Sequence, residues 1–395
     1  PEDAFCPIVS PNGNTIVFGM TISGDPSGSL VASSLDGLQQ HRLFSGPEHT
    51  ILHCARWAPN GKELLFPITR NGRVDIWTVS SQTGLLHRSG QAVKLTNGPL
   101  SYTGVAPTAD GKHIFAIGTQ RRGELVRYDV KSREFVPFLS GISAIDPTFS
   151  GDGQWVAYSS YPDHNLWRSR VDGSERLQLS YPPMDVAYPF ISPDGKKVCF
   201  RVGTGLYVAG MDGTSARKLV EENVLGAEWS PDSNSLVVTR IVPGKHSGDS
   251  NYFDLFTLNL ASGRTTVVPS SEGKVGPWWL PDDTLIGVTD DLAKLVRFEF
   301  RTGQWSELVS GSFVYWAPSL DSKYMYYTPG GSDPKLMRIR LADRKVEEVT
   351  SLSGFRSIVD PTYQNTPFSV APDGSPVFTR DIGTQEIYAL DVKWP

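Results

Sequence analysis

Hydrophobic and polar positions follow one phrase that recurs from end to end of the chain. An apolar strand leads into Ser or Ala, then Pro, Asp or Asn, and Gly, and a second apolar strand follows after a polar residue. Pro presets φ for a turn, Asp or Asn bonds to its own backbone, and Gly accepts a positive φ, so the phrase predicts a tight turn joining two antiparallel strands. The clearest copies are VSPNGNTIVF (9–18), WAPNGKELLF (57–66), ISPDGKKVCF (191–200) and WSPDSNSLVV (229–238), and weaker copies begin at Pro107, Phe149, Trp279, Pro318 and Val370.

A second pattern follows most copies of the phrase. A strand of alternating polarity runs into Asp-Gly, Ser-Gly or a charged equivalent, and a fourth strand comes after it. Alternation with a period of two over such lengths indicates strands whose two faces meet different environments. Four antiparallel strands per unit are typical of a propeller blade that packs both faces on its neighbours. Examples are 165–180, 205–220, 254–268, 294–309 and 335–350.

The spacing of the turns sets the architecture. The last residues of successive turns are 38 (195 to 233) to 52 (322 to 374) residues apart, close to the ~40–45 residues of one blade. The sequence therefore predicts an all-β fold: a single β-propeller domain over 1–395, with four-stranded antiparallel blades. Nine units are counted, but the ninth lacks a fourth strand, so eight or nine blades remain open. The predicted units are 1–46, 47–98, 99–141, 142–182, 183–221, 222–270, 271–311, 312–354 and 355–395.

Composition and charge narrow the classes of partner. The 395 residues carry a formal charge of −5 with acids and bases interspersed, so no basic stripe suits nucleic acid. No apolar run approaches the ~18 residues that a membrane span needs. We therefore expect neither nucleic-acid binding nor membrane insertion by this chain. Because it opens at Pro1 rather than Met, we expect a processed or excised segment.

Two of the three cysteines occupy equivalent places. Cys6 and Cys54 each lie seven residues before the end of their turns, at Gly13 and Gly61. Neighbouring inner strands lie close near a propeller axis, so a disulfide between them is one interpretation. The other interpretation is two small buried residues that pack between blades. Cys199 lies in an apolar strand and is expected in the core.

The sequence carries little that indicates catalysis. No G-x-S-x-G nucleophile elbow is present. His49 and His53 lie four residues apart near Cys54, but on a strand or loop these positions do not converge as they would on a helix, so a solvated loop before a strand is the simpler interpretation. The repeated Asp of each turn is a turn residue, and ring symmetry would hold these carboxyls too far apart to work in pairs. We expect a protein that is not an enzyme and that has no cofactor, no catalytic residues and no metal site.

Two places are candidates for binding, because loops on a rigid scaffold are where such folds carry function. A long loop at 241–254 has a composition suited to protein contact, although a surface hairpin is the simpler interpretation. Its binding residues would be Lys245, His246, Asp249, Tyr252 and Phe253. The axial channel is the second place, where charged and aromatic residues near the first strands could hold a small ligand or a peptide. The channel-lining residues would be Arg56, Asp146, Tyr188, Glu228, Trp278 and Tyr315.

The repeated phrase resembles the TolB-type, WD-like β-propeller repeat over essentially the whole chain. The stretches LWRSRVDGSERLQLSYPPM (166–184) and SVAPDGSPVFTRDIGTQEIYALDV (369–392) are similar to the C-terminal propeller of acidobacterial-type membrane regulators with a winged-helix or kinase domain. The resemblance implies an extracytoplasmic sensor or interaction module, periplasmic or extracellular, with a protein partner or self-association and no catalytic residues to transfer. A cytoplasmic location stays open.

Three functions are compatible with these patterns. The first is a non-catalytic propeller that binds a protein or a small ligand. The second is a self-assembling structural protein of a surface or sheath, since a disc with two loop-bearing faces could stack or tile. The third is a propeller-type lyase or glycosidase, which would need carboxylates or histidines that converge at the mouth of the channel.

Overall fold

The computed structural model describes residues 2–22, 25–46, 50–70, 73–81, 92–244, 250–358 and 368–394. Within these ranges every regular element is a β-strand, and the strands form nine antiparallel sheets. The prediction of an all-β propeller fold with four-stranded antiparallel blades is confirmed, and nine sheets agree with nine repeat units. The chain divides into two compact units, one of Pro1–Arg122 with Gly383–Pro395 and one of Gly123–Ile382.

The turns that join the first two strands of each sheet follow from the repeated phrase. In the copy at 191–200, the Ser192 hydroxyl donates to Asp194 (2.6 Å) and accepts the backbone N–H of Lys197 (2.9 Å). Gly195 has a φ of 70°, which Gly adopts at no steric cost. In the equivalent copy at Ser230, the hydroxyl bond lowers the pKa of Asp232. The repeated carboxylates are thus held as parts of turns.

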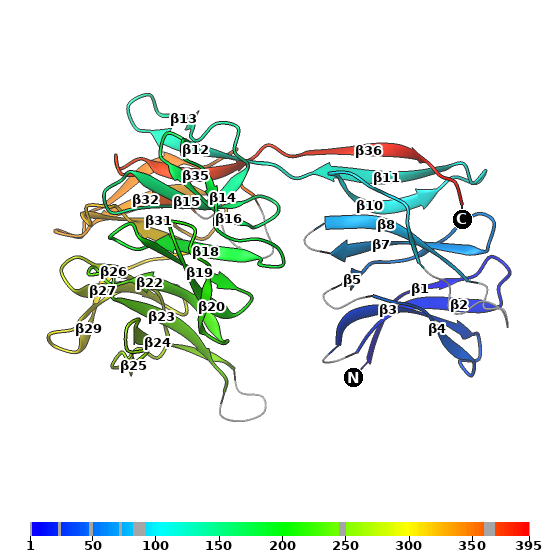
Figure 1. Ribbon diagram of the computed structural model, residues 1–395, viewed down its shortest axis with the longest axis horizontal. Helices are drawn as coiled ribbons and strands as arrows, with labels where there is room; N and C mark the ends of the chain where they lie inside the picture. The colour runs from blue at the N-terminus through cyan, green and yellow to red at the C-terminus, as the bar shows by residue number, and fades with distance from the viewer. Residues whose placement is uncertain are drawn as a thin grey trace. The chain divides into compact units, whose positions relative to one another are not determined.

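The unit Gly123–Ile382 contains six of the nine sheets (Figure 1). Five of them are built from consecutive strands, in the order of the chain. They are β14(Ala144–Phe149) to β17(Leu177–Gln178), with β15(Trp155–Ser160) and β16(Leu166–Arg170); β18(Val186–Ile191) to β21(Arg217–Val220), with β19(Lys197–Val202) and β20(Gly205–Gly210); β22(Val224–Trp229) to β25(Thr265–Val267), with β23(Ser235–Val242) and β24(Tyr252–Asn259); β26(Lys274–Leu280) to β29(Gln304–Ser310), with β27(Thr284–Thr289) and β28(Lys294–Glu299); and β30(Tyr315–Pro318) to β33(Val346–Ser351), with β31(Tyr324–Thr328) and β32(Lys335–Arg340).

The sixth sheet closes this unit into a ring. It takes two strands from each end of the segment, in the order β13-β12-β35-β34. Its inner strand contacts the first strand of the sheet on either side, β30 and β14, so the six sheets form a closed propeller. The Thr379 hydroxyl donates to the carbonyl of Ala144 across one seam (3.2 Å). The four strands are β12(Gly123–Asp129), β13(Glu134–Pro137), β34(Phe368–Val370) and β35(Pro376–Asp381).

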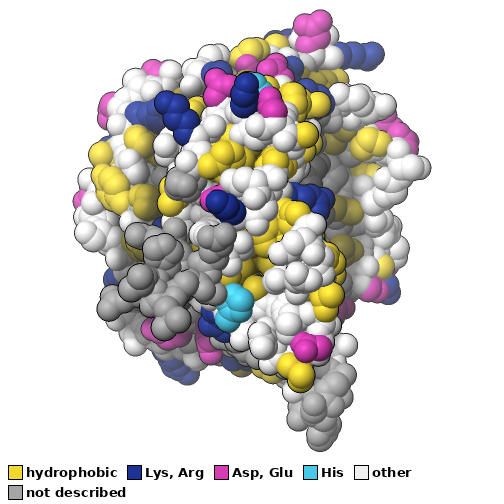
Figure 2. Space-filling model, turned by 90° about the vertical axis from the view of Figure 1, so that its right-hand side faces the viewer, with side chains coloured by type: hydrophobic (Ala, Val, Ile, Leu, Met, Phe, Trp, Pro, Cys, Tyr) yellow, Lys and Arg dark blue, Asp and Glu magenta, His cyan; other side chains and the backbone are white. Residues whose placement is uncertain are grey.

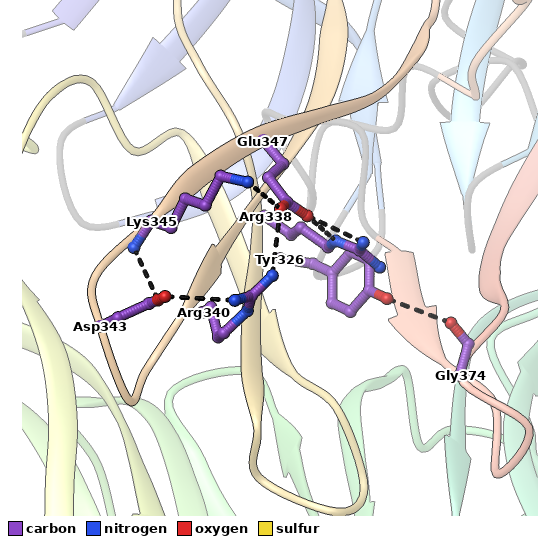
Figure 3. Close-up of polar contacts among 7 residues, drawn as sticks. All are labelled: Tyr326, Arg338, Arg340, Asp343, Lys345, Glu347 and Gly374. Carbon is purple, nitrogen blue, oxygen red and sulfur yellow. Dashed lines mark hydrogen bonds and ion pairs between the residues drawn. The ribbon is translucent and has the colours of Figure 1, made fainter.

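The other seam of the ring is held by a hydroxyl beside an ion-pair network (Figure 3). Tyr326 on β31 donates to the carbonyl of Gly374, in the turn between β34 and β35 (3.3 Å). On the same sheet, Arg338 of β32 donates to Glu347 of β33 through Nε (3.1 Å) and Nη2 (2.8 Å), and Arg340 also reaches Glu347 (3.3 Å). These contacts pair the outer strands of this blade and attach it to the closing sheet.

The unit of Pro1–Arg122 with Gly383–Pro395 contains the other three sheets. The third of them has three strands and borrows its last strand from the C-terminal segment. The sheets are β1(Glu2–Val9), β2(Thr15–Ile22), β3(Asp25–Ser34) and β4(Gln40–Ser45); β5(Ile51–Leu52), β6(Arg56–Trp57), β7(Glu63–Arg70), β8(Arg73–Ser80) and β9(Val93–Lys94); and β10(Ser101–Pro107), β11(His113–Gln120) and β36(Thr384–Asp391).

The grouping of the sheets differs from the sequence expectation of one ring over 1–395. Six sheets close within Gly123–Ile382, and two predicted units are divided. The first half of unit 99–141 pairs with the second half of unit 355–395, as β11 with β36, while β12 pairs with β35 in another sheet. The physical reason is that the repeated phrase fixes hairpins, whereas the pairing of strands distant in sequence leaves no local signal.

Cys6 and Cys54 form a disulfide between the first two sheets, with their Cα atoms 5.3 Å apart. Cys199 is a free and fully buried thiol on β19. Burial raises the pKa of that thiol and keeps it protonated.

The disulfide predicts the count of reactive thiols. Alkylation of the unfolded, unreduced protein should modify one cysteine, Cys199, and alkylation after reduction should modify three, as read by intact-mass spectrometry. Three modified cysteines without any reductant, in protein isolated under thiol-blocking conditions, would contradict the bridge.

Candidate binding site

The first strands of the Gly123–Ile382 ring carry bulges that turn side chains toward one another. The register of β14 shifts between Ile145 and Thr148, and that of β18 shifts between Ala187 and Phe190. The residue at each bulge, Asp146 or Tyr188, has a φ of 51°. A positive φ costs free energy for a residue other than Gly, and for Tyr more than for Asp. Bulges of this kind commonly re-aim a side chain at a functional site.

A proline follows the bulged residue on three strands of the ring. Pro147, Pro189 and Pro277 come after Asp146, Tyr188 and Gly276 in turn. Proline has no N–H to donate to the ladder, so it is tolerated in a sheet at such interruptions. This X-Pro pair, seven and six residues before the end of the turn, is a sequence signal for the bulge that the repeat analysis did not use.

Five of the six predicted channel residues are brought together by these strands. They line one cavity of about 350 Å³, and each comes from a different blade. The five are Asp146, Tyr188, Glu228, Trp278 and Tyr315. The sixth, Arg56, does not join them: it lies on β6 in the other unit, beside a separate cavity with Cys54 and His53. Its position relative to its own turn is comparable, but the ring that closes does not contain its sheet.

A second cavity of about 500 Å³ shares part of this wall. Four of the five residues line both cavities, so Tyr188, Glu228, Trp278 and Tyr315 form the layer between them. The first cavity is bordered by turns of the repeated phrase, at Pro193 and Pro231, whereas the second is bordered by Arg201, Phe253 and Asp290. These two sets of residues define two opposite approaches to one axial layer.

Glu228 is a buried carboxyl of this layer whose pKa is raised. Its Oε1 accepts the backbone N–H of Trp229 (2.9 Å), and its Oε2 is buried with no hydrogen-bond partner in the described part of the chain. Burial away from water disfavours the charged form and raises the pKa of the Glu228 carboxyl to about 8. At neutral pH this group is therefore mostly protonated, and it titrates just above neutrality.

The aromatic members of the layer are held by bonds of their own. The Trp278 indole donates to the carbonyl of Trp316 (3.2 Å), and its ring meets Phe190 edge-on with 5.3 Å between centroids. The Trp316 indole in turn donates to the carbonyl of Gly276 (2.9 Å). Burial and then the nearby Asp146 carboxyl raise the pKa of Tyr315, which stays a neutral phenol.

Arg201 is a functional candidate that the repeat analysis missed. Its guanidinium carbon lies 4.9 Å from the centre of the Tyr188 ring, and its Nη1 donates to the carbonyl of Leu225 (3.3 Å). It lines the second cavity but not the first. Ser369 on β34 was also missed, although it stands five residues before the end of its turn, at the offset of Glu228 and Trp278; it lines the first cavity.

The predicted binding loop is described in part. Lys245, His246 and Asp249 lie outside the described residues. Tyr252 pairs with Val242 at the start of β24, and Phe253 pairs with Ile241 and lines the second cavity. A role for this loop in binding stays a prediction.

Among the described residues, no group of three or more His, Cys, Asp and Glu side chains is placed to hold a metal ion. No helix in those ranges is long and apolar enough to cross a membrane.

The raised pKa of Glu228 predicts how stability depends on pH. A carboxyl whose pKa is higher in the folded state favours folding below its unfolded value near 4.5, and this contribution is lost as pH rises through about 8. The wild type should therefore lose stability relative to Glu228→Gln between pH 5 and pH 9, by a few kcal/mol. Urea unfolding of both proteins, followed by tryptophan fluorescence, measures the difference.

Glu222→Gln, at an exposed site in the loop that leads into β22, is the control and should follow the wild type at every pH. A difference between Glu228→Gln and the wild type that is constant from pH 5 to pH 9 would contradict a buried, titrating carboxyl.

Comparisons with known proteins bear on the fold. No family model matches the chain. An uncharacterized protein of Agrobacterium fabrum is 22% identical over 255 residues, which are 59% of this chain and 80% of that protein. Putative TolB from Agrobacterium tumefaciens matches with a TM-score of 0.53 at 16% identity, over 66% of this chain and 99% of its own. TolB from Acinetobacter baumannii matches with a TM-score of 0.45 at 15% identity, over 73% and 81%. The chain has the fold of a TolB-like β-propeller.

Proposed function

We propose that this chain is a non-catalytic binding module, and that its ligand site is the axial cavity of the Gly123–Ile382 ring. The observation that carries the proposal is the Glu228 Oε2 atom, buried at the cavity wall without a hydrogen-bond partner among the described residues. A buried polar atom left unsatisfied costs about 1–3 kcal/mol or more. A ligand that donates to it recovers that free energy, which is a reason for such a group to persist.

Further support comes from how the site is built. Aromatic walls with a few convergent polar groups are typical of ligand cavities. Tyr188 and Asp146 hold conformations that cost free energy, and both side chains line the cavity. Strain of this kind clusters at binding sites. These features favour the channel over the turns, whose carboxylates are satisfied locally.

The absence of catalysis is also part of the proposal. Asp146 and Glu228 line the cavity without a third acid or a His beside them in a metal-binding group, as far as the described residues extend. At neutral pH Glu228 is mostly protonated and Tyr315 is a neutral phenol, so neither is a ready general base. This argues for binding over the lyase or glycosidase alternative.

We further propose an extracytoplasmic location and a role as a sensor or interaction module, as the acidobacterial-type resemblance implies. The Cys6–Cys54 disulfide supports this, because disulfides persist mainly in oxidising compartments. One face of the protein has Lys and Arg interspersed with Asp and Glu among its described residues (Figure 2). Interspersed charge fits a protein or small-molecule partner better than nucleic acid.

A cavity-filling variant tests the proposed site. Ser369→Phe places a ring into the first cavity from β34, and Thr350→Phe, on the outer strand β33, is the matched control. A panel of small cations, anions and neutral polar compounds, screened by saturation-transfer NMR, should contain compounds that bind the wild type and Thr350→Phe but not Ser369→Phe.

Every bound compound should be recovered unchanged after prolonged incubation. If the compounds still bind Ser369→Phe, the site lies outside the cavity. If a bound compound is converted to a product, the non-catalytic assignment is wrong.

A further inference from the structure

We propose that the axial cavity recognises a cationic group, a guanidinium or an ammonium, that enters from the side of the repeated turns and is held by Glu228 and Asp146 among aromatic rings. This inference rests on the proposed binding function and names the chemistry of its ligand. A side chain of a protein partner and a small free amine would both present such a group.

The charges that line the first cavity are of one sign. Among the described residues of its wall, the carboxyls are those of Asp146 and Glu228, and no Lys, Arg or His is present. Burial first, and then both carboxyls, raise the pKa of the same phenol, Tyr315. The two acids therefore face a common space, and the potential in that space favours a cation.

The aromatic rings complete a site for a cation rather than for a metal ion. Tyr188, Trp278 and Tyr315 stand in the same layer as the two carboxyls. Ring faces attract guanidinium and ammonium groups through the ring quadrupole. Hard metal ions instead take six or more oxygen ligands, which this wall does not offer in its described residues.

The direction of entry follows from Arg201. Its guanidinium already lies over the Tyr188 ring, and it borders the second cavity. A ligand cation approaching from that side would meet the like charge of Arg201, whereas no Lys, Arg or His is found among the described residues of the first cavity's wall. The first cavity is therefore the approach that a cation takes, and Arg201 shows the stacking that a guanidinium adopts in this layer.

The protonation of Glu228 couples binding to pH. The titratable and charged groups that face it from the packed strands are Asp146, Tyr188, Cys199, Arg201 and Tyr315. Below pH 8 a cation must displace the proton of Glu228, and above pH 8 it meets a carboxylate. Binding of a guanidinium, which does not titrate in this range, should strengthen on the order of tenfold from pH 6.5 to pH 9 and release a proton.

Matched probes test the charge of the ligand. Ethylguanidinium and ethylurea have nearly the same shape and differ in charge, and propionate supplies the opposite charge. Titrations followed by NMR at pH 8.5 should show binding of ethylguanidinium and at least tenfold weaker binding of ethylurea and propionate. An acetylated Gly-Arg-Gly amide, compared with its citrulline counterpart, shows whether the cation is accepted on a peptide or only as a small free molecule.

Variants test the residues. Glu228→Gln keeps shape and removes charge, so it should weaken ethylguanidinium at least tenfold and abolish the pH dependence, while the exposed Glu222→Gln should change neither. Asp146→Asn provides a second variant if Glu228→Gln folds poorly, and it should weaken binding without removing the pH dependence.

The outcomes separate this inference from the function on which it rests. If ethylurea or propionate binds as tightly as ethylguanidinium, and Ser369→Phe still abolishes that binding, the cation site is overturned but the ligand-binding cavity remains. An absence of binding by every probe of any charge would overturn both. If neither Glu228→Gln nor Asp146→Asn changes the affinity for ethylguanidinium, the cation binds elsewhere.

Discussion

The antiparallel pairing of β12 with β35 is the contact on which the site depends. Five residue pairs, from Gly123 with Asp381 to Arg127 with Val377, join segments more than 240 positions apart in sequence. Val126 and Phe378 face each other in this ladder without solvent exposure, and Arg380 donates to Glu124 across it (3.2 Å). Without this closure the six blades would have two open faces, and the first strands would not converge on one axis.

Several residues of the axial layer adopt states that cost free energy, and packing in the closed ring must offset that cost. Asp146 and Tyr188 adopt left-handed backbone conformations, and Glu228 is taken out of water with one oxygen unsatisfied among the described residues. Each of these features costs stability. They persist because apolar blades pack tightly around them, as at Trp229, which is almost fully buried and donates to the carbonyl of Phe190 on the next blade (2.7 Å).

How much the sequence could predict follows from the range of each interaction. The turns are local, so Ser192, Asp194 and Gly195 were correctly placed from the repeated phrase alone. The channel residues depend on the offset from that turn, and five of six were brought together. Arg56 does not join the other five because the pairing of β12 with β35 decides which sheets share a ring, and the sheet of Arg56 is not among them. Arg201 lies on a second strand, which no offset from the turn placed at the axis.

The most direct test of this account is amide hydrogen exchange on the closing strands of the whole protein. If β12 and β35 complete a closed ring, the amides of Leu125 and Phe378 should exchange as slowly as those of Val198 and Val237, inside neighbouring blades. Exchange of Leu125 and Phe378 at the rate of frayed ends, while Val198 and Val237 stay protected, would contradict the closed ring and the axial site built on it.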